Sequence, residues 1–72
     1  MVKKNIIHTN HSMRRKFERD ISDDEIAQTL NDPDYTLSSA ECRKIAIKRI
    51  KDKTIHVVYK EERGNIIIIT VY

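Results

Sequence analysis

The spacing of apolar residues changes once along this chain, at its only proline, Pro33. Before Pro33, apolar side chains recur three and four residues apart, which is the period of an amphipathic helix. After Pro33, apolar and polar side chains alternate along several short stretches, which is the period of a half-buried β-strand. This change predicts an α+β fold, with helices in the first half of the chain and an antiparallel sheet in the second.

Length limits what such a fold can contain. A chain of 72 residues forms one domain, residues 1–72, and buries only about 60% of its unfolded surface, which excludes a two-domain enzyme with a separate cofactor domain. The longest apolar run, Ile66–Ile69, is far shorter than the roughly 20 residues that cross a bilayer, so we expect no membrane partner. Because Cys42 is the only cysteine, no intrachain disulfide can form, and we expect a cytoplasmic protein.

The first helix is predicted over residues 10–20. Thr9 is its expected N-cap, because a threonine oxygen can accept a hydrogen bond from a free backbone N–H of the first turn. Met13 and Phe17 are spaced i, i+4 and form its apolar positions. We expect this apolar pair to anchor the helix on the rest of the domain.

The second helix has the stronger start signal. Ser22 and Glu25 match the S-x-x-E capping box, and Ile21 and Ile26 are placed as a hydrophobic staple. The acidic residues of its first turn also suit the positive end of the helix dipole. The helix is predicted to end just before Pro33, because the residue before a proline disfavours the helical conformation.

Three or four antiparallel strands are predicted after the proline. They cover residues 44–50, 54–61 and 66–72, and residues 35–37 are either a further short strand or an extended connection. The only glycine, Gly64, lies between the last two strands, where a hairpin needs a positive φ. The last strand carries no charge, which is typical of a central position. The expected architecture is a two-layer sandwich of two N-terminal helices on a three- to four-stranded antiparallel sheet.

The formal charge of +3 conceals large local differences. Residues 1–19 carry six basic side chains and one acidic one, residues 20–34 carry six acidic and no basic ones, and residues 35–53 carry six basic and two acidic ones. Capping of the second helix accounts for about half of the acidic segment. The basic segments favour contact with a polyanion, although such a charge content is also ordinary for a small soluble domain.

A possible reactive site lies on the first helix. His11, Arg15 and Arg19 follow each other at four-residue intervals, so they fall on one stripe, since four residues advance a helix by only about 40°. The positive end of the helix dipole disfavours an imidazolium at His11, which leaves a neutral ring to move a proton, and two guanidiniums can hold a phosphate. Together they suit attack of an RNA 2′-hydroxyl on its own phosphodiester. The alternative is a solvated helix face, with Arg15 paired to Glu18 or to a carboxylate of the second helix.

Other site classes have little support in the residue types. One cysteine and three histidines do not form a zinc-ligand pattern, and a chain with one glycine has no glycine-rich phosphate loop. We therefore expect no metal and no cofactor. Cys42 is interpreted as a packing or surface residue.

A second group of polar residues lies in the predicted sheet. The face toward the helices is expected to carry Ile45, Ile47, Val57, Tyr59, Ile67, Ile69 and Val71. The reverse face is then expected to carry Lys48, His56, Val58, Lys60, Thr70 and Tyr72, a basic and aromatic surface typical of contacts with a nucleic-acid backbone. Three further isoleucines, Ile50, Ile66 and Ile68, also fall there, so we expect a partner segment, the segment around Tyr35 or a second copy of the chain to cover it.

Two of these stretches carry a resemblance to a known family. Residues 11–22 read H-S-M-R-R-K-F-E-R-D-I-S, and the chain closes with I-T-V-Y. These stretches resemble the H-x-x-x-R-x-x-x-R-G-I-S and closing I-T-V-Y of small bacterial proteins classed as domain of unknown function 4258, a family similar to BrnT and, more distantly, RelE/ParE toxins. The resemblance extends from about Thr9 to Tyr72. It implies a RelE/BrnT-like, microbial RNase-like fold and an mRNA-cleaving toxin held by an antitoxin.

One departure from the family pattern affects the first helix. Asp20 stands where the family has glycine, so we expect the helix to end without the usual left-handed residue or to run straight into Ile21.

The combined prediction is a metal-independent endoribonuclease of toxin type. His11 is the expected acid or base, Arg15 and Arg19 are expected to hold the scissile phosphate, and the substrate groove is expected to include Lys48, His56 and Tyr72. The expected partners are RNA and an antitoxin protein, and a homodimer is a further assembly that this interpretation allows. The alternative is a non-catalytic binding module of the same fold that acts on a protein or RNA partner.

Overall fold

Five strands and two helices make up residues 5–39 and 41–72, the part of the chain that the structure, a computed structural model, describes. In chain order they are β1 (Asn5–His8), α1 (Asn10–Glu18), α2 (Asp23–Asn31), β2 (Tyr35–Ser38), β3 (Arg43–Ile50), β4 (Lys53–Glu62) and β5 (Asn65–Val71). Both helices precede Pro33 and four of the five strands follow it, so the α+β class is confirmed.

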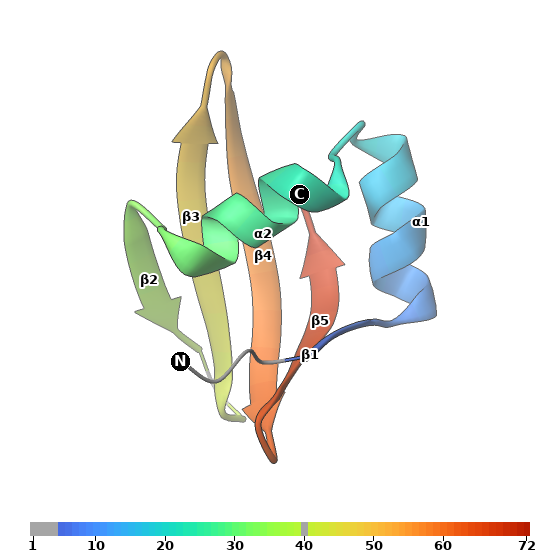
Figure 1. Ribbon diagram of the computed structural model, residues 1–72, viewed down its shortest axis with the longest axis vertical. Helices are drawn as coiled ribbons and strands as arrows, with labels where there is room; N and C mark the ends of the chain where they lie inside the picture. The colour runs from blue at the N-terminus through green and yellow to red at the C-terminus, as the bar shows by residue number, and fades with distance from the viewer. Residues whose placement is uncertain (1–4, 40) are drawn as a thin grey trace.

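The strands form one mixed sheet in the order β1-β5-β4-β3-β2 (Figure 1). Neighbours from β2 to β5 are antiparallel, whereas β1 pairs in parallel with the first half of β5. The expected sheet of three to four antiparallel strands is therefore corrected to five strands with a parallel edge strand. Four residues are too few to show the alternation that reveals a strand, and β1 for this reason has no clear signal in the sequence.

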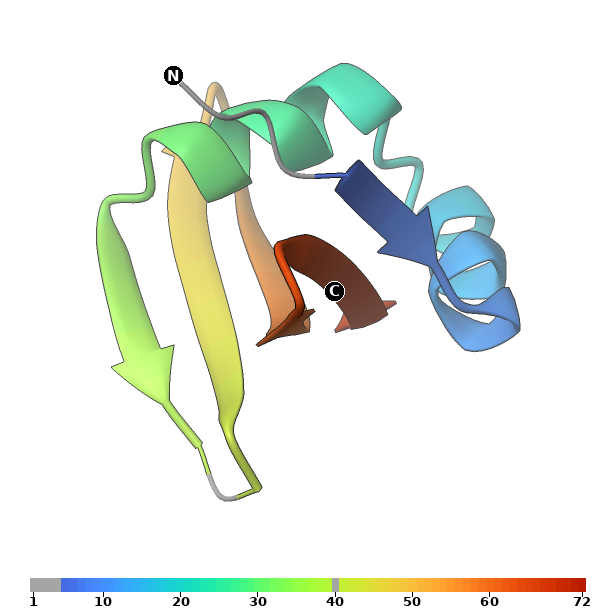
Figure 2. The same ribbon diagram turned by 60° about the horizontal axis from the view of Figure 1, so that its bottom comes forward.

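The first helix, α1, lies at one side of the sheet with β1, and β2 lies at the other (Figure 2). Its predicted N-cap is confirmed, because Thr9 Oγ1 accepts a hydrogen bond from Ser12 N at 3.2 Å. The predicted apolar anchor is wrong: Met13 and Phe17 are exposed, Phe17 by 86%, and the buried residue of the helix is Ser12. A helix that flanks a sheet edge covers no broad apolar surface. A small buried polar residue is therefore sufficient at the contact between α1 and the sheet edge.

The end of α1 also differs from the expectation. Asp20 adopts a left-handed backbone with a φ of 54°. Its N–H donates to Phe17 O at 3.3 Å, and Ile21 N donates to Lys16 O at 3.0 Å, which is the hydrogen-bond pattern of a Schellman motif. Asp20 therefore takes the place that glycine usually holds, because aspartate is one of the few residues that tolerate this conformation.

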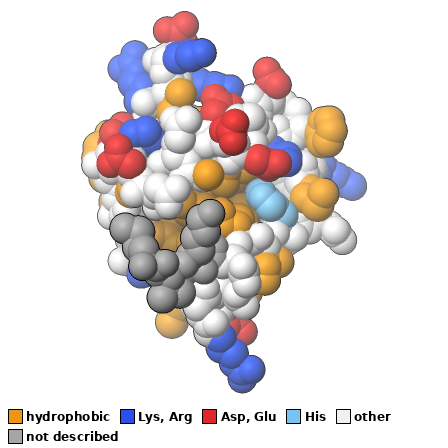
Figure 3. Space-filling view, in the orientation of Figure 1, with side chains coloured by type: hydrophobic (Ala, Val, Ile, Leu, Met, Phe, Trp, Pro, Cys, Tyr) orange, Lys and Arg blue, Asp and Glu red, His pale blue; other side chains and the backbone are white. Residues whose placement is uncertain are grey.

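The second helix, α2, crosses the sheet over β3 and β4 (Figure 1). Its predicted capping box is confirmed by two hydrogen bonds, Glu25 N to Ser22 Oγ at 3.1 Å and Ser22 N to Glu25 Oε1 at 2.9 Å. Ile21 and Ile26, the predicted staple pair, are both buried. Acidic side chains gather over α2 in Figure 3, in agreement with its acidic first turn.

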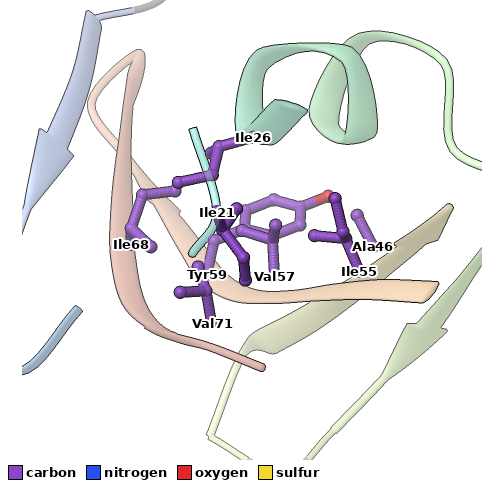
Figure 4. Close-up of a cluster of buried hydrophobic side chains, with 8 residues drawn as sticks. All are labelled: Ile21, Ile26, Ala46, Ile55, Val57, Tyr59, Ile68 and Val71. Atoms are coloured by element: carbon purple, nitrogen blue, oxygen red, sulfur yellow. The ribbon is translucent and has the colours of Figure 1, made fainter. Parts of the chain in front are cut away.

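The core lies between α2 and the sheet, and Figure 4 shows Ile26 pointing from α2 toward it. Val57 of β4 is at its centre, paired with Ala46 on one side and Val71 on the other. Its buried members are Ile21, Ile26, Ala46, Ile55, Val57, Tyr59, Ile68 and Val71.

A β-bulge decides which residues of β5 reach this core. The register shifts between Val58 and Tyr59 of β4, and Ile69 of β5 is left without a partner there. Because the extra residue reverses the alternation, the even-numbered isoleucines before it share the core face with Val71. The expectation that Ile67 and Ile69 face the helices is therefore wrong.

The expected orientation of β3 is also wrong. Ala46 pairs with Val57 below α2, whereas Ile47 pairs with His56 and faces away from the helices, as does Ile45. Both sets of alternating residues in this strand include apolar side chains, so the pattern could not distinguish the faces. The register with β4 determines which side chains of β3 face the helices. The side of the sheet that carries Ile47 and His56 is called the reverse face below.

Candidate functional site

The three residues predicted on α1 line a single hollow. It measures about 310 Å³, lies between α1 and the end of β5, and is lined by His11, Arg15, Arg19, Thr70, Val71 and Tyr72. We call it the α1–β5 hollow. The four-residue spacing does place the three side chains on one face of the helix. That face is turned toward the edge of the sheet.

The position of α1 follows from where β1 ends. β1 pairs only with residues Asn65–Ile68, the first half of β5. Thr9 follows directly, and its side-chain hydroxyl lies 3.0 Å from Ile68 O and 3.2 Å from Ile69 O, within donating distance of both carbonyls. The chain is thus attached to the middle of β5, and α1 runs beside the half of β5 that β1 leaves uncovered.

Ser12 holds the first turn of α1 in place. It is fully buried, its Oγ donates to Thr9 O at 2.9 Å, and the same Oγ lies 3.3 Å from His8 Nδ1. These contacts constrain the turn that also carries His11, the residue just before Ser12. The buried serine therefore fixes the position of this turn, and His11 lines the hollow beside β5.

The hollow has a positive lining. None of its six lining residues has an acidic side chain, and two of them are arginines. Arg15 Nη1 lies 3.8 Å from Glu18 Oε2, a contact between half-exposed groups that contributes little. The nearby carboxylate of α2, Asp23, is bound instead by Lys16 at 2.7 Å, and this hydrogen bond holds the pKa of Asp23 below its usual value. Arg15 thus has this weak pairing with Glu18, the one expected of a solvated helix face, and Asp23 binds neither arginine of the hollow.

Tyr72 connects the hollow with His56. The two rings are stacked, with centroids 4.7 Å apart and planes 7° from parallel. Their backbones also exchange hydrogen bonds, His56 N to Tyr72 O at 2.8 Å and Tyr72 N to His56 O at 2.9 Å. Within the described residues, the buried Nδ1 of His56 has no hydrogen-bond partner. His56 therefore lies on the side of Tyr72 that faces away from the hollow, one strand further into the sheet.

The backbone of β5 contributes to the hollow as well. Since Tyr72 exchanges both hydrogen bonds with His56 on β4, the preceding residue, Val71, directs its N–H and C=O toward the opposite edge. That edge is the one beside α1, and Val71 is among the lining residues. The sequence predicts Thr70 only on the nucleic-acid-binding reverse face and Val71 only on the face toward the helices; the closing I-T-V-Y was the signal that contained both.

Lys48 lies elsewhere. It pairs with Ile55 in the sheet and so belongs to the face below α2, which corrects its expected place on the reverse face. Its Nζ donates to Asp32 O at 2.9 Å and lies 3.5 Å from Asp32 Oδ2, at the end of α2. A cation at the C-terminus of a helix is favourable for the helix itself. The structure therefore does not bring Lys48 to the α1–β5 hollow.

A second hollow, of about 370 Å³, lies where α1 turns into α2. Of its two lysines, Lys16 binds Asp23, and Lys53 donates to Asp20 O at 2.9 Å and lies 3.0 Å from Glu25 Oε2. Glu25 in turn accepts the capping hydrogen bond from Ser22. These groups are already used in holding the two helices to the sheet, so this hollow is structural.

The described residues contain neither a group of metal-binding side chains nor a membrane-spanning helix. In residues 5–39 and 41–72, no three His, Cys, Asp or Glu side chains are grouped so that they could hold a metal ion. Neither of the helices in this part of the chain has the length and apolar character needed to span a membrane.

Comparison with known proteins gives one match. Residues 8–72 match the family model described as "Domain of unknown function (DUF4258)". No curated protein and no solved structure matches the chain. The matched span includes α1, the whole of β5 and therefore all six residues of the α1–β5 hollow.

Proposed function

The chain belongs to the DUF4258 family, and for this member we propose the function of a metal-independent endoribonuclease of toxin type, which cleaves mRNA in the α1–β5 hollow. One observation carries the proposal. An imidazole and two guanidiniums, from His11, Arg15 and Arg19, line one hollow that has no acidic side chain in its lining. Such a set matches the needs of a phosphodiester, which is an anion whose cleavage requires proton transfer.

Each side chain has a role in this reaction. Arg15 and Arg19 bind the non-bridging oxygens of the scissile phosphate and neutralise the charge that grows on them. His11 removes the proton of the RNA 2′-hydroxyl. The 2′ oxygen then forms a bond to phosphorus as the bond between phosphorus and the 5′ oxygen breaks, and the leaving oxygen takes a proton from water. The products are a 2′,3′-cyclic phosphate and a free 5′-hydroxyl.

The resemblance to BrnT and RelE/ParE toxins supports the same proposal. It is indirect: the H-x-x-x-R-x-x-x-R spacing of His11, Arg15 and Arg19 and the closing I-T-V-Y resemble the DUF4258 pattern, and that family is similar to these toxins. Two N-terminal helices followed by an antiparallel meander are the arrangement expected of a RelE/BrnT-like fold. In this proposal the natural partner that restrains the enzyme is an antitoxin protein, and the substrate is mRNA.

Substitution of the histidine tests the proposal. We expect His11→Ala to reduce cleavage of an end-labelled single-stranded RNA by about 100-fold or more, because acid–base catalysis contributes about that much. Arg15→Ala and Arg19→Ala should also reduce cleavage. Arg14→Ala is the matched control, since Arg14 carries the same charge on the same helix but does not line the hollow. EDTA should leave the rate unchanged.

Two outcomes would overturn the enzymatic proposal. One is that His11→Ala, with a native circular dichroism spectrum, cleaves as fast as the wild type. The other is that the wild-type protein cuts no RNA. The second outcome would favour a non-catalytic binding module, for which the reverse face is the supporting feature, because it exposes Tyr35 by 63% and Leu37 by 52% beside the half-buried Ile45 and Val58.

A further inference from the structure

We propose that Tyr72 forms a stacking site for one unpaired nucleobase, so that the α1–β5 hollow binds a single-stranded nucleotide by its base as well as by its phosphate. The inference rests on the proposed function for the identity of the ligand as RNA. It adds the substrate class, single-stranded RNA, and a second point of attachment.

The first observation is a row of side chains across the reverse face. Tyr35, Ile47 and His56 pair with one another on β2, β3 and β4, and Tyr72, the residue just after β5, exchanges backbone hydrogen bonds with His56 and continues this row. Tyr72 is the last member of this row. Its neighbour on one side is His56, whose ring stacks on it nearly parallel.

The second observation is what lies on the other side of Tyr72. β1 stops at the position of Ile68, so no strand continues the sheet beside Tyr72. The neighbouring structure there is α1, and the space between them is the α1–β5 hollow. Tyr72 is 44% exposed although one ring face is covered by His56. The uncovered face is therefore the one available to a ligand in the hollow.

The third observation is the chemistry that surrounds this ring. A flat π-surface and two guanidiniums, of Arg15 and Arg19, line the same hollow. The arginines are four residues apart, which is about 6 Å along a helix axis. A ligand that satisfies both elements has a planar aromatic part joined to an anionic part, and a nucleotide has this composition. A base in this position would extend the row of Tyr35, Ile47, His56 and Tyr72 by one member.

Stacking of this kind selects single strands. Bases in a duplex already have both faces covered by their neighbours, whereas an unpaired base can leave the stack and lie on an aromatic side chain. Every base has a π-face, so the site should tolerate different sequences. His56 acts as a positioning residue, because its ring holds the phenol of Tyr72 in the orientation that a base requires.

A fluorescent base analogue tests the proposal on the unmodified chain. We expect the emission of a single 2-aminopurine in a single-stranded RNA to be quenched when the wild-type protein binds, at one position of the analogue along the oligonucleotide. A fully 2′-deoxy version of the same strand prevents cleavage during the titration. Binding without quenching at any position would overturn the inference.

Variants of the stacking pair provide the second arm. Tyr72→Leu should weaken binding by about 5- to 150-fold, the range measured for loss of a base–aromatic stack, and Tyr72→Phe should bind like the wild type. The salt dependence of binding should stay unchanged in Tyr72→Leu and become shallower in Arg15→Ala, because only the second variant removes a phosphate contact. His56→Ala should reduce the quenching, and His56→Phe should restore it.

These results separate the inference from the proposed enzymatic function. If RNA is bound with quenching but never cut, the stacking site is supported and the endoribonuclease function is overturned. If Tyr72→Leu and Tyr72→Phe bind RNA with equal affinity, the stacking site is overturned, whether or not the RNA is cut. Equal binding of duplex RNA, or of inorganic polyphosphate, would show that charge alone holds the ligand.

Discussion

At the scale of single residues, the unusual feature is how often a left-handed backbone falls on a residue other than glycine. The chain has one glycine, yet among the described residues five others have a positive φ: Asp20, Glu41, Cys42, Lys51 and Arg63. A left-handed backbone costs a residue with a Cβ atom about 1 kcal/mol or more. Each of these positions therefore lowers the stability of the fold relative to a glycine at the same place. Asp20 is the one that lies in the turn between the two helices.

Asp20→Gly tests this cost. We expect the substitution to raise the free energy of unfolding by about 0.5 kcal/mol, because glycine adopts a φ of 54° without strain but loses more entropy on folding. Urea unfolding followed by circular dichroism measures the change. Asp24→Gly is the control, since Asp24 lies in the helical backbone of α2, and there glycine should lower the free energy of unfolding by about 0.5 kcal/mol, through its lower helix propensity and the lost charge at the helix N-terminus. A loss of stability in Asp20→Gly would contradict the argument.

At the scale of elements, end-capping specifies α1 better than its apolar residues do, whereas in α2 the cap and the buried Ile26 agree. Thr9 and Ser22 cap α1 and α2 as predicted, whereas the apolar pair of α1 points to solvent. A cap satisfies backbone groups within a few residues, so its effect does not depend on the rest of the fold. An apolar stripe is buried only if another element is there to cover it, and no described element covers Phe17.

The cap of α2 makes stability depend on pH. The backbone N–H of Ser22 and the ammonium of Lys53 hold the pKa of Glu25 below its usual 4.5. Because the pKa is lower in the folded than in the unfolded chain, the carboxylate stabilises the fold above about pH 4.5, and this contribution is lost as the pH falls through the folded pKa. We expect Glu25→Gln to unfold more easily by about 1 kcal/mol at pH 7 and to lose part of the stability change between pH 5 and about pH 3.

Urea midpoints measured across this pH range check the prediction. Glu18→Gln is a suitable control, because the contact of Glu18 is the 3.8 Å one to Arg15 and not a helix cap. The control should follow the wild-type pH dependence. If Glu25→Gln follows it too, the capping carboxylate is not the source of the dependence.

At the scale of the whole molecule, the two faces of the sheet differ in how far they are covered. The core residues lie below α2, whereas no described helix lies over the reverse face, whose apolar side chains are half-buried or exposed apart from the buried Ile47. Val57 and Val58 show the difference within one strand. Val57 is fully buried in the core, and its neighbour Val58 is half-buried on the reverse face.

Truncation of these two valines compares the two faces. We expect Val57→Ala to lower the free energy of unfolding by about 2 kcal/mol, and Val58→Ala by less than half as much, because it removes fewer contacts from a partly solvated site. Thermal or urea unfolding of both variants at low protein concentration measures this. If both cost the same, and stability rises with protein concentration, a second copy of the chain covers the reverse face.

Signals within a few residues were enough to predict the α+β class, the two helices with their N-caps, three of the five strands and the glycine turn, because caps, periods and turns act locally. They left residues 35–37, which form β2, open as a strand or an extended connection. They also placed His11, Arg15 and Arg19 on one helix face, since that follows from helix geometry alone. The short β1, the bulge at Ile69 and the orientation of β3 arise from pairing between strands distant in sequence, and no local pattern contains that information. The same strand pairing ends β1 halfway along β5, places α1 beside Tyr72 and turns Lys48 toward α2. The residues that line the hollow therefore follow from the tertiary structure and not from local sequence.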